Sequence, residues 1–290
     1  MLMQQLFTGL SIGGMYALMA VGYSLIYSLL NFTNFAHSIA VTAGAYTGFY
    51  MLSKVSPKLS IAVIAAILIG GVVSSIIELT SYNPLLNKGA KRIYLLIAGL
   101  GLSTIGQNII IISIGGRFKA FPNASAMKLI NVGGITMGSV DIIMIIVSVI
   151  ALIFVELLMQ KTKIGLAIRG AAFDLDVTSL MGVNVSQLIL FVFMLAGSLA
   201  GLSGFFLGMK YTAYPALGDM TLKAFIASVL GGLGSIPGAV LGATVLGIME
   251  TLISAYISSS MRDIFSFAIM VFVLIIKPNG FMGKNVEDKA

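Results

Sequence analysis

Apolar runs of about 20 residues recur along the whole chain, and each is long enough to cross a hydrocarbon core of roughly 30 Å as a helix. The stretches 61–77 and 142–158 are apolar on every face. A barrel strand would instead alternate apolar and polar residues over about ten positions. Because lipid offers no partner to unpaired backbone groups, the sequence predicts membrane-spanning helices.

Composition excludes several other classes of protein. Of 290 residues, 58% are hydrophobic and 9% are charged, against roughly 25% charged in a soluble domain. The 17 Lys and Arg scatter singly between apolar segments, which favours loops at lipid headgroups over nucleic-acid binding. Without cysteine and with one histidine, we predict no disulfide, no metal site and no cysteine nucleophile.

We therefore expect a single transmembrane domain over residues 1–290. Its predicted fold is an all-α, polytopic bundle of about eight to ten helices with broken or re-entrant segments. The first apolar segment, 6–30, is longer than a signal-peptide core and is expected to be a retained span. Each half contains one interrupted segment, 31–48 and 224–242. Matched interruptions point to a transport site between related halves, although the similarity between them is too weak to prove a repeat.

Two polar groups of residues are candidates for the translocation path. Asn34 and His37 are three residues apart, so on a helix they would share one face. Gln107 and Asn108 lie in a small-residue stretch of the fourth span. Polar groups at membrane depth are costly unless they are paired or wetted. Both pairs therefore fit either a buried hydrogen-bond network or a lining of the path.

A glycine-rich segment near the C-terminus contains Gly231, Gly232 and Gly234. The Lys-Ser/Thr of a phosphate-binding loop is missing, and no strand precedes the segment. Two interpretations stay open: a tight turn between closely packed helix ends, or a broken helix whose terminus faces the path. We predict no cofactor in this chain, so any ATP must be bound by a partner.

The most polar stretch, about 161–186, predicts short helices outside the lipid. Asp176 is expected to cap a turn that ends at Gly182, and Asn184 with Gln187 resembles a capping box for the next span. The stretch fits a charged loop that anchors two spans, or a docking surface for a soluble partner. We favour the docking surface.

The acidic residues Glu78, Asp141, Glu156 and Glu250 lie toward segment ends, where a structural or interfacial role is expected rather than a proton relay. An alternative is an ion-coupled transporter that uses Glu156 or Glu250 as its proton site. An intramembrane enzyme is disfavoured, because one histidine, no cysteine and no close acidic pair leave little from which to build an active site.

Several of these stretches together resemble the permease subunits of branched-chain amino-acid ABC importers, of the LivH type. The matching motifs cover nearly the whole chain: glycine-rich 6–27 with Asn34-Phe-Ala-His37, then Glu78-Leu-Thr-Ser-Tyr82-Asn-Pro84-Leu, Gly165 to Asn184, Lys223 to Gly238-Ala, and Lys277-Pro-Asn-Gly280. The segment 223–239 is the most specific of them.

The resemblance implies a multi-pass protein of the prokaryotic cytoplasmic (inner) membrane. Its partners would be a second homologous permease, two cytoplasmic ATP-binding subunits and an extracytoplasmic binding protein that delivers the amino acid. The ATPase would be coupled through a set of residues between the fifth and sixth spans: Gly165, Arg169, Asp174, Asp176 and Gly182. The binding protein would dock on the loop 115–138 and neighbouring turns.

The chain departs from the family pattern at three positions. Ser38 stands where Gly is usual, Asn83 where Arg is common, and Phe173 where a polar residue is usual. Related permeases carry urea, short amides, and more remotely sugars and nucleosides, so a permease for another small polar solute is the alternative. The predicted loops divide the 17 Lys and Arg almost evenly between the two sides. The orientation therefore follows from the resemblance and not from charge.

Overall fold

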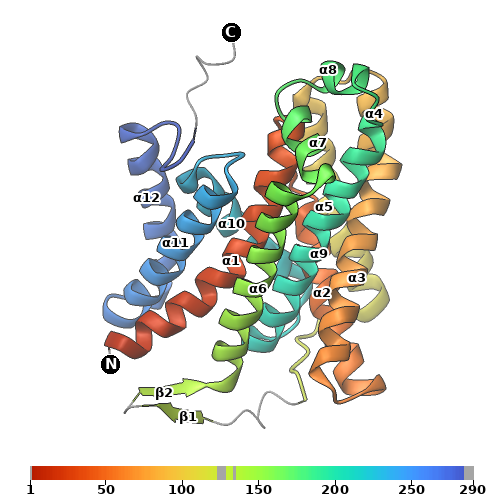
Figure 1. Ribbon diagram of the computed structural model, residues 1–290. Helices are drawn as coiled ribbons and strands as arrows, with labels where there is room; N and C mark the ends of the chain where they lie inside the picture. Colours follow the sequence, from red (N-terminus) through yellow and green to blue (C-terminus); the bar gives the residue numbers. More distant parts are fainter. Residues whose placement is uncertain (1, 123–128, 133–134, 284–290) are drawn as a thin grey trace.

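The computed structural model describes residues 2–122, 129–132 and 135–283 of the chain. It is a polytopic helical bundle (Figure 1). Seven helical segments in the described part are long and apolar enough to cross a membrane: Leu2–Leu30, Leu59–Asn87, Arg92–Ile114, Ser139–Lys161, Val185–Tyr211, Ile236–Tyr256 and Ser259–Ile276. Two shorter helices, α2 (His37–Tyr50) and α10 (Thr221–Gly231), lie in the interrupted segments of the expected bundle.

The element order places short helices between the long ones. The long α-helices are α1 (Leu2–Leu30), α3 (Leu59–Ile77), α5 (Arg92–Ile114), α6 (Ser139–Lys161), α9 (Val185–Tyr211), α11 (Ile236–Tyr256) and α12 (Arg262–Ile276). The short ones are α4 (Asn83–Asn87), α7 (Lys163–Ala171) and α8 (Leu175–Leu180), with 3-10 helices η4 (Pro215–Met220) and η5 (Ser259–Met261). Two π-helical turns, η1 (Met51–Val55) and η2 (Glu78–Tyr82), extend α2 and α3.

Two connections between spans contain regular structure. After the third span, η2 and α4 continue the helix as far as Asn87. The loop 115–138 contains a short hairpin, in which β1 (Leu129–Val132) pairs antiparallel with β2 (Ile135–Gly138). Residues 123–128 and 133–134 of that loop lie outside the described part.

The helices form two sets that run in opposite directions. The set α1, α2, α3, α5 has the order long, half-length, long, long, and α9, α10, α11, α12 repeats this order. In the two leading helices, Ser203 Oγ of α9 donates to the Met15 carbonyl of α1 at 2.9 Å, while Ala196 lies opposite Gly22. Higher numbers in α9 therefore meet lower numbers in α1, and the two helices are antiparallel (Figure 1).

Glycine contacts hold the equivalent helix pairs of both sets. Where α9 meets α3, a Cβ on Gly201 would overlap the Ala66 carbonyl oxygen, and one on Gly70 would overlap that of Gly197. Where α11 meets α1, a Cβ on Gly247 would overlap the backbone of Gly13. Such small residues let membrane helices approach closely. The interruptions predicted from sequence thus belong to two similarly packed halves.

The bundle has two distinct ends. The hairpin formed by α7 and α8 lies at one end with α4 and the C-terminal turn, while the N-terminus and the β1–β2 hairpin lie at the other (Figure 1). We call these the α7–α8 end and the β-hairpin end.

Candidate translocation site

The first half-length helix begins inside the bundle because the chain turns back after α1. Asn31 has φ 51° and its N–H donates to the Tyr27 carbonyl at 2.8 Å. Asn is one of the few residues other than Gly that accept this left-handed conformation at a helix end. The turn 31–36 then brings His37, the first residue of α2, against Gly22 in the interior of α1.

The second half-length helix, α10, begins at a depth in the bundle close to that of the start of α2. After α9, Thr212 has φ 109°, and η4 runs back into the bundle, where Gly218 packs against Ser38 of α2. The Thr221 hydroxyl donates to the Gly218 carbonyl at 2.7 Å at the start of α10. The N-termini of α2 and α10 therefore lie within the bundle, and the two helices lead to opposite ends.

A small polar cavity lies beside these two starts. It measures about 10 Å³ and is lined from α2, α5 and η4 by Ser38, Ile39, Thr42, Ser103, Gln107, Ile110, Pro215, Gly218 and Asp219. That volume holds about one water molecule. The hydroxyls of Ser38 and Ser103 are 2.7 Å apart and join α2 to α5, and the Thr42 hydroxyl accepts the Gly218 N–H at 3.0 Å. These contacts form part of the cavity wall.

Asn34 and His37 are both buried, but they do not share a helix face as expected. Asn34 lies in the turn before α2, because α1 ends at Leu30 and the chain reverses. Its Oδ1 accepts the Tyr82 hydroxyl at 2.7 Å. The His37 ring packs edge-on against Tyr23 at 5.0 Å, and neither ring nitrogen has a hydrogen-bond partner within the described part. Neither residue lines the cavity, whereas Ser38, which directly follows His37, does.

The two amides of α5 point in different directions. Gln107 lines the cavity. Asn108 is exposed on the outer face of the helix, where its Nδ2 donates to the Thr104 carbonyl one turn earlier at 2.8 Å. The structure brings only Gln107 together with Ser38 and Asp219.

The glycine-rich segment forms a tight turn at the end of α10 that is remote from the cavity. Gly231 and Gly232 are buried, and Gly232 and Gly234 have φ 107° and 84°. The C-terminal turn closes over this helix end, since the Phe281 and Met282 N–H groups donate to the Leu230 and Gly231 carbonyls, both at 2.8 Å. This geometry matches the tight-turn interpretation.

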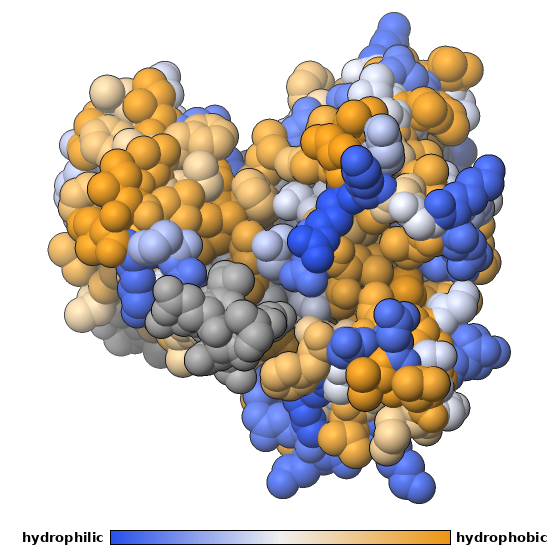
Figure 2. Space-filling model, turned by 90° about the horizontal axis from the view of Figure 1, so that it is seen from above, coloured by the Kyte–Doolittle hydropathy of each residue, from blue (hydrophilic) through white to orange (hydrophobic). Residues whose placement is uncertain are grey.

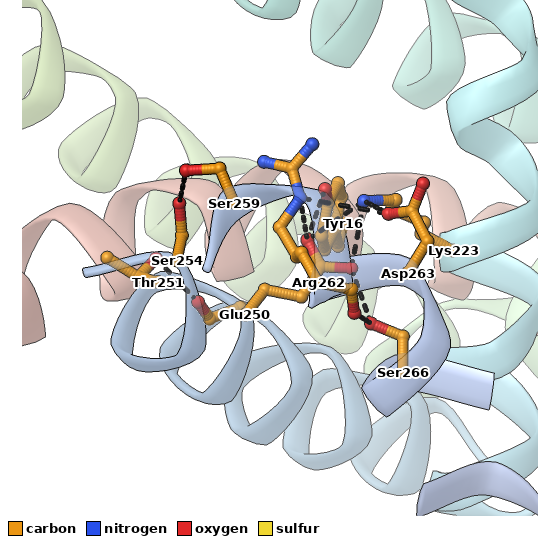
Figure 3. Close-up of polar contacts among 10 residues, drawn as sticks. Tyr16, Lys223, Glu250, Thr251, Ser254, Ser259, Arg262, Asp263 and Ser266 are labelled. Carbon is orange, nitrogen blue, oxygen red and sulfur yellow. Dashed lines mark hydrogen bonds and ion pairs between the residues drawn. The ribbon is translucent and has the colours of Figure 1, made fainter. Parts of the chain in front are cut away.

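A buried cluster of charges fastens the start of α10 (Figure 3). Glu250 of α11 is 1% exposed. Lys223 Nζ of α10 lies 3.0 Å from Glu250 Oε1 and 2.8 Å from Asp263 Oδ1 of α12. Glu250 also accepts hydrogen bonds from Tyr16 at 3.0 Å and Ser266 at 2.8 Å. These contacts join four helices.

The four acidic residues have polar partners, as a structural role requires. Arg262 Nε lies 3.8 Å from Glu250 Oε2, so two cations, Lys223 and Arg262, face this carboxylate. Asp141, in the first turn of α6, accepts the Ser11 hydroxyl at 2.8 Å and pairs with Lys210. Glu156 accepts from Gln160 within its own helix. Glu78 is fully buried and accepts from the Asn83 amide at 3.2 Å.

The segment 161–186 forms the expected helical hairpin, with one change in its capping. Asp174, not Asp176, caps α8: its Oδ1 accepts the N–H groups of Asp176 and Val177 at 2.8 and 2.9 Å. Asp174 has the extended backbone of an N-cap residue, whereas Asp176 is already helical. Gly182 has φ 85° after α8, and Asn184 accepts the Gln187 N–H at 3.1 Å, as predicted.

The hairpin is anchored where it meets α6. Gly165 is buried, and a Cβ there would overlap the Leu158 and Met159 carbonyl oxygens. Arg169 Nη1 donates to the Met159 carbonyl. The outer face exposes large apolar side chains: Leu166, Phe173, Leu180 and Met181. From this end the surface is a mosaic of apolar and polar groups, and a notch separates the lobe that contains α12 from the rest (Figure 2).

Sequence reasoning missed four residues that shape the site: Thr42, Tyr82, Ser103 and Asp219. A weak signal existed for Ser103, which is four residues before Gln107 and so shares its helix face. Thr42 has the same spacing from Ser38. No local pattern marks Asp219, because only the return of η4 into the bundle places it beside α5.

Residues 5–274 match the family described as "Branched-chain amino acid transport system / permease component". The chain belongs to this family. The high-affinity branched-chain amino acid transport system permease protein LivH of Salmonella typhimurium is 33% identical over 99% of this chain and 97% of its own length. The corresponding protein BraD of Pseudomonas aeruginosa is 31% identical over the same shares.

A more distant relative extends the similarity to an archaeon. The probable branched-chain amino acid transport permease protein LivH of Methanocaldococcus jannaschii is 31% identical over 92% of this chain and 88% of its own length. A comparison with solved structures gave no significant match. With the seven candidate spans, family membership makes this chain a multi-pass membrane permease component.

Proposed function

We propose that this chain is a membrane subunit of an ATP-driven importer that moves branched-chain amino acids across a prokaryotic inner membrane. The family membership and the names of the relatives support the class and the solute. The observation that carries the proposal is the meeting of two half-length helices beside a polar cavity. Interrupted helices of this kind form solute sites in other transporters.

The lining of the cavity suits a zwitterion with an apolar side chain. Hydroxyl and amide groups and the Asp219 carboxylate can bind the polar ends, while Ile39 and Ile110 offer apolar contact. At about 10 Å³ the cavity is far smaller than an amino acid. Passage therefore requires α2 and α5 to separate, which makes the present arrangement a closed one.

The outer face of α5 supports a second permease subunit as the neighbour. Thr104 and Asn108 are exposed there among Ile105 and Ile109. Polar side chains that face lipid are costly, and such residues usually face another helix or a water-filled path. We place the companion permease against this face, with the path between the two subunits.

The exposed apolar side chains of α7 and α8 support docking of two ATP-binding subunits at the α7–α8 end. Leu180 is 86% and Met181 81% exposed, although both lie outside the candidate spans. ATP is bound by those partners, and this chain carries out no covalent step. The extracytoplasmic binding protein docks at the β-hairpin end, on the loop 115–138.

The docking assignment is tested in the complete transporter reconstituted in liposomes. We expect Leu180→Asp and Arg169→Ala to lower substrate-stimulated ATP hydrolysis, because the first removes apolar contact area from the docking face and the second removes the hydrogen bond that anchors the hairpin to α6. Ile150→Ala, an exposed change midway along α6 and away from both ends, is the control. Unchanged hydrolysis in both hairpin variants would reject the docking face. Uptake by this chain alone, driven by a proton gradient without ATP, would reject the ATP-driven class.

Replacing the solute tests the substrate. Leucine, isoleucine or valine should stimulate hydrolysis and be taken up by the reconstituted complex. Uptake of urea or a short amide with no response to leucine would instead support the alternative permease.

A further inference from the structure

The π turn η2 lies between the α7–α8 end and the turn 31–36. A π-helical turn carries one more residue per hydrogen-bonded ring than an α-helix, is rare, and frequently occurs at functional sites. η2 joins α3 to α4 within one continuous helical segment. Tyr82 of η2 contacts the turn 31–36, and the next residue, Asn83, contacts the start of α9.

One direction leads to the hairpin. Asn83 Nδ2 donates to Ser186 Oγ at 2.9 Å and to Glu78 Oε1 at 3.2 Å. Ser186 is the second residue of α9, the helix that directly follows α8 and its connection. Asn87 Nδ2 donates to Asn83 Oδ1 at 2.7 Å, so the Asn83 amide is held at both of its atoms. Movement of the hairpin and the start of α9 therefore acts on Asn83.

The other direction leads to the cavity. Tyr82 is fully buried, and its hydroxyl donates to Asn34 Oδ1 at 2.7 Å. The Tyr82 ring packs between Phe32 at 5.2 Å and Phe193 at 5.4 Å. Tyr82 thus contacts two residues of the turn 31–36, which leads within four residues of Asn34 to Ser38 in the cavity wall.

The π turn itself can exist in two arrangements. A shift of one residue, from π to α hydrogen bonding, rotates the adjoining side chains about the helix axis by about 100°. Such a rotation would separate Tyr82 from Asn34. Glu78 begins the turn, and its Oε2 has no hydrogen-bond partner in the described part. This buried oxygen is available to a new donor after such a rearrangement.

We propose that η2 is the switch through which the α7–α8 hairpin moves the turn 31–36, with Tyr82 and Asn83 as positioning residues. The proposal rests on the proposed function, since it takes the hairpin as the docking site of the ATPase. Coupling between sites requires an element with two discrete arrangements that both sites bias. Tyr82 of η2 contacts the turn 31–36, the next residue, Asn83, contacts Ser186, and a π turn has the geometry of such an element.

The first test compares transport with ATP hydrolysis in the reconstituted transporter. Tyr82→Phe keeps the packed ring and removes the hydroxyl, and Asn83→Ala removes both amide contacts. We expect about five-fold fewer molecules transported per ATP, in the usual range of coupling factors, while stimulated hydrolysis is retained. Tyr94→Phe is the matched control, because Tyr94 is 56% exposed on α5. Unchanged transport per ATP in both variants overturns the proposal.

The second test follows the cavity wall directly, using the absence of cysteine from the chain. Ser38→Cys provides a single thiol whose labelling by an impermeant maleimide is measured with and without ATP. We expect the rate of labelling to change with ATP when Tyr82 is present and to lose this response in Tyr82→Phe. If the Tyr82 hydroxyl contributes only to stability, the labelling rate will still change with ATP in Tyr82→Phe. That result contradicts the switch.

Failure of the switch and failure of the docking assignment give different results. If Arg169→Ala and Leu180→Asp leave hydrolysis unchanged, the hairpin is not the docking site. If they impair hydrolysis while Tyr82→Phe and Asn83→Ala transport normally, the docking site stands and η2 is not its route to the cavity.

Discussion

The half-length helices α2 and α10 begin at a similar depth, but they are held in different ways. Neutral groups hold α2: the Ser38 hydroxyl bonds Ser103 at 2.7 Å, and Thr42 accepts the Gly218 N–H. Charges hold α10, through Lys223 and the buried Glu250. Breaking one neutral hydrogen bond costs about 0.5–1.5 kcal/mol, whereas removing one partner of a buried ion pair costs about 3–5 kcal/mol.

This difference assigns separate mechanical roles to the two halves. Contacts that open and close in every cycle must be inexpensive to break, and those around α2 and α5 are neutral and border the cavity. The charged cluster instead joins α1, α10, α11 and α12. We expect the α2 side to move while the α10 side stays in place.

The largest effect is expected from Glu250→Ala. The change leaves Lys223 and Arg262 without their buried carboxylate and also removes the acceptor for Tyr16 and Ser266. We expect a loss of about 3–5 kcal/mol in stability, measured by thermal unfolding of the purified protein in detergent. The α10 half should unfold first.

Asp263→Ala is the control for this change. Asp263 pairs with the same Lys223, but its side chain is 64% exposed, and exposed ion pairs contribute only about 0–1 kcal/mol. Equal losses for Glu250→Ala and Asp263→Ala would show that burial of the cluster is not what fixes α10.

An intermediate effect is expected from Thr42→Val, which changes the neutral side. Valine keeps the shape of threonine but leaves the buried Gly218 N–H without its acceptor. An unsatisfied buried donor costs about 1–3 kcal/mol. Thr104→Val is the control, because the Thr104 hydroxyl is exposed and bonds only within its own helix. The melting temperature of Thr42→Val should fall below that of the control, and a fall as large as that of Glu250→Ala would contradict the division into a fixed and a moving half.

The long helices could be predicted from sequence because their cause is local. Sustained apolar runs need no information about neighbours, so the stretches 61–77 and 142–158, which are apolar on every face, lie within α3 and α6. The helix cap at Asn184 and the positive-φ glycine at 182 were also predictable from local sequence. The cap of α8 was expected at Asp176 and lies at Asp174. Both are acidic residues near the start of α8, and only the backbone conformation distinguishes them.

The site was less predictable because long-range contacts assemble it. Asn34 and His37 were expected on one helix face, but the reversal at Asn31 depends on packing against α1. Asp219 and Gln107 are over 100 positions apart and meet only through η4. Gln107 and Asn108 were indistinguishable as neighbouring amides until the rotation of α5 placed one in the cavity and the other on the outer face.

The smallest effect is expected from two serine changes that compare the halves directly. Ser103→Ala removes the hydroxyl contact between α2 and α5, and Ser228→Ala removes a hydroxyl contact of 2.8 Å between α10 and Ser24 of α1. Each should cost only about 0.5–1.5 kcal/mol, since Ser38 keeps its bond to the Phe35 carbonyl and α10 keeps its ion pairs. Transport should nevertheless change more in Ser103→Ala, because Ser38 and Ser103 line the cavity and Ser24 and Ser228 do not. If the two variants melt at similar temperatures and Ser103→Ala has the larger transport defect, the result supports a moving α2 and a fixed α10. A larger transport defect in Ser228→Ala would reverse the assignment, because it would show that the contacts of α10 are the ones that open.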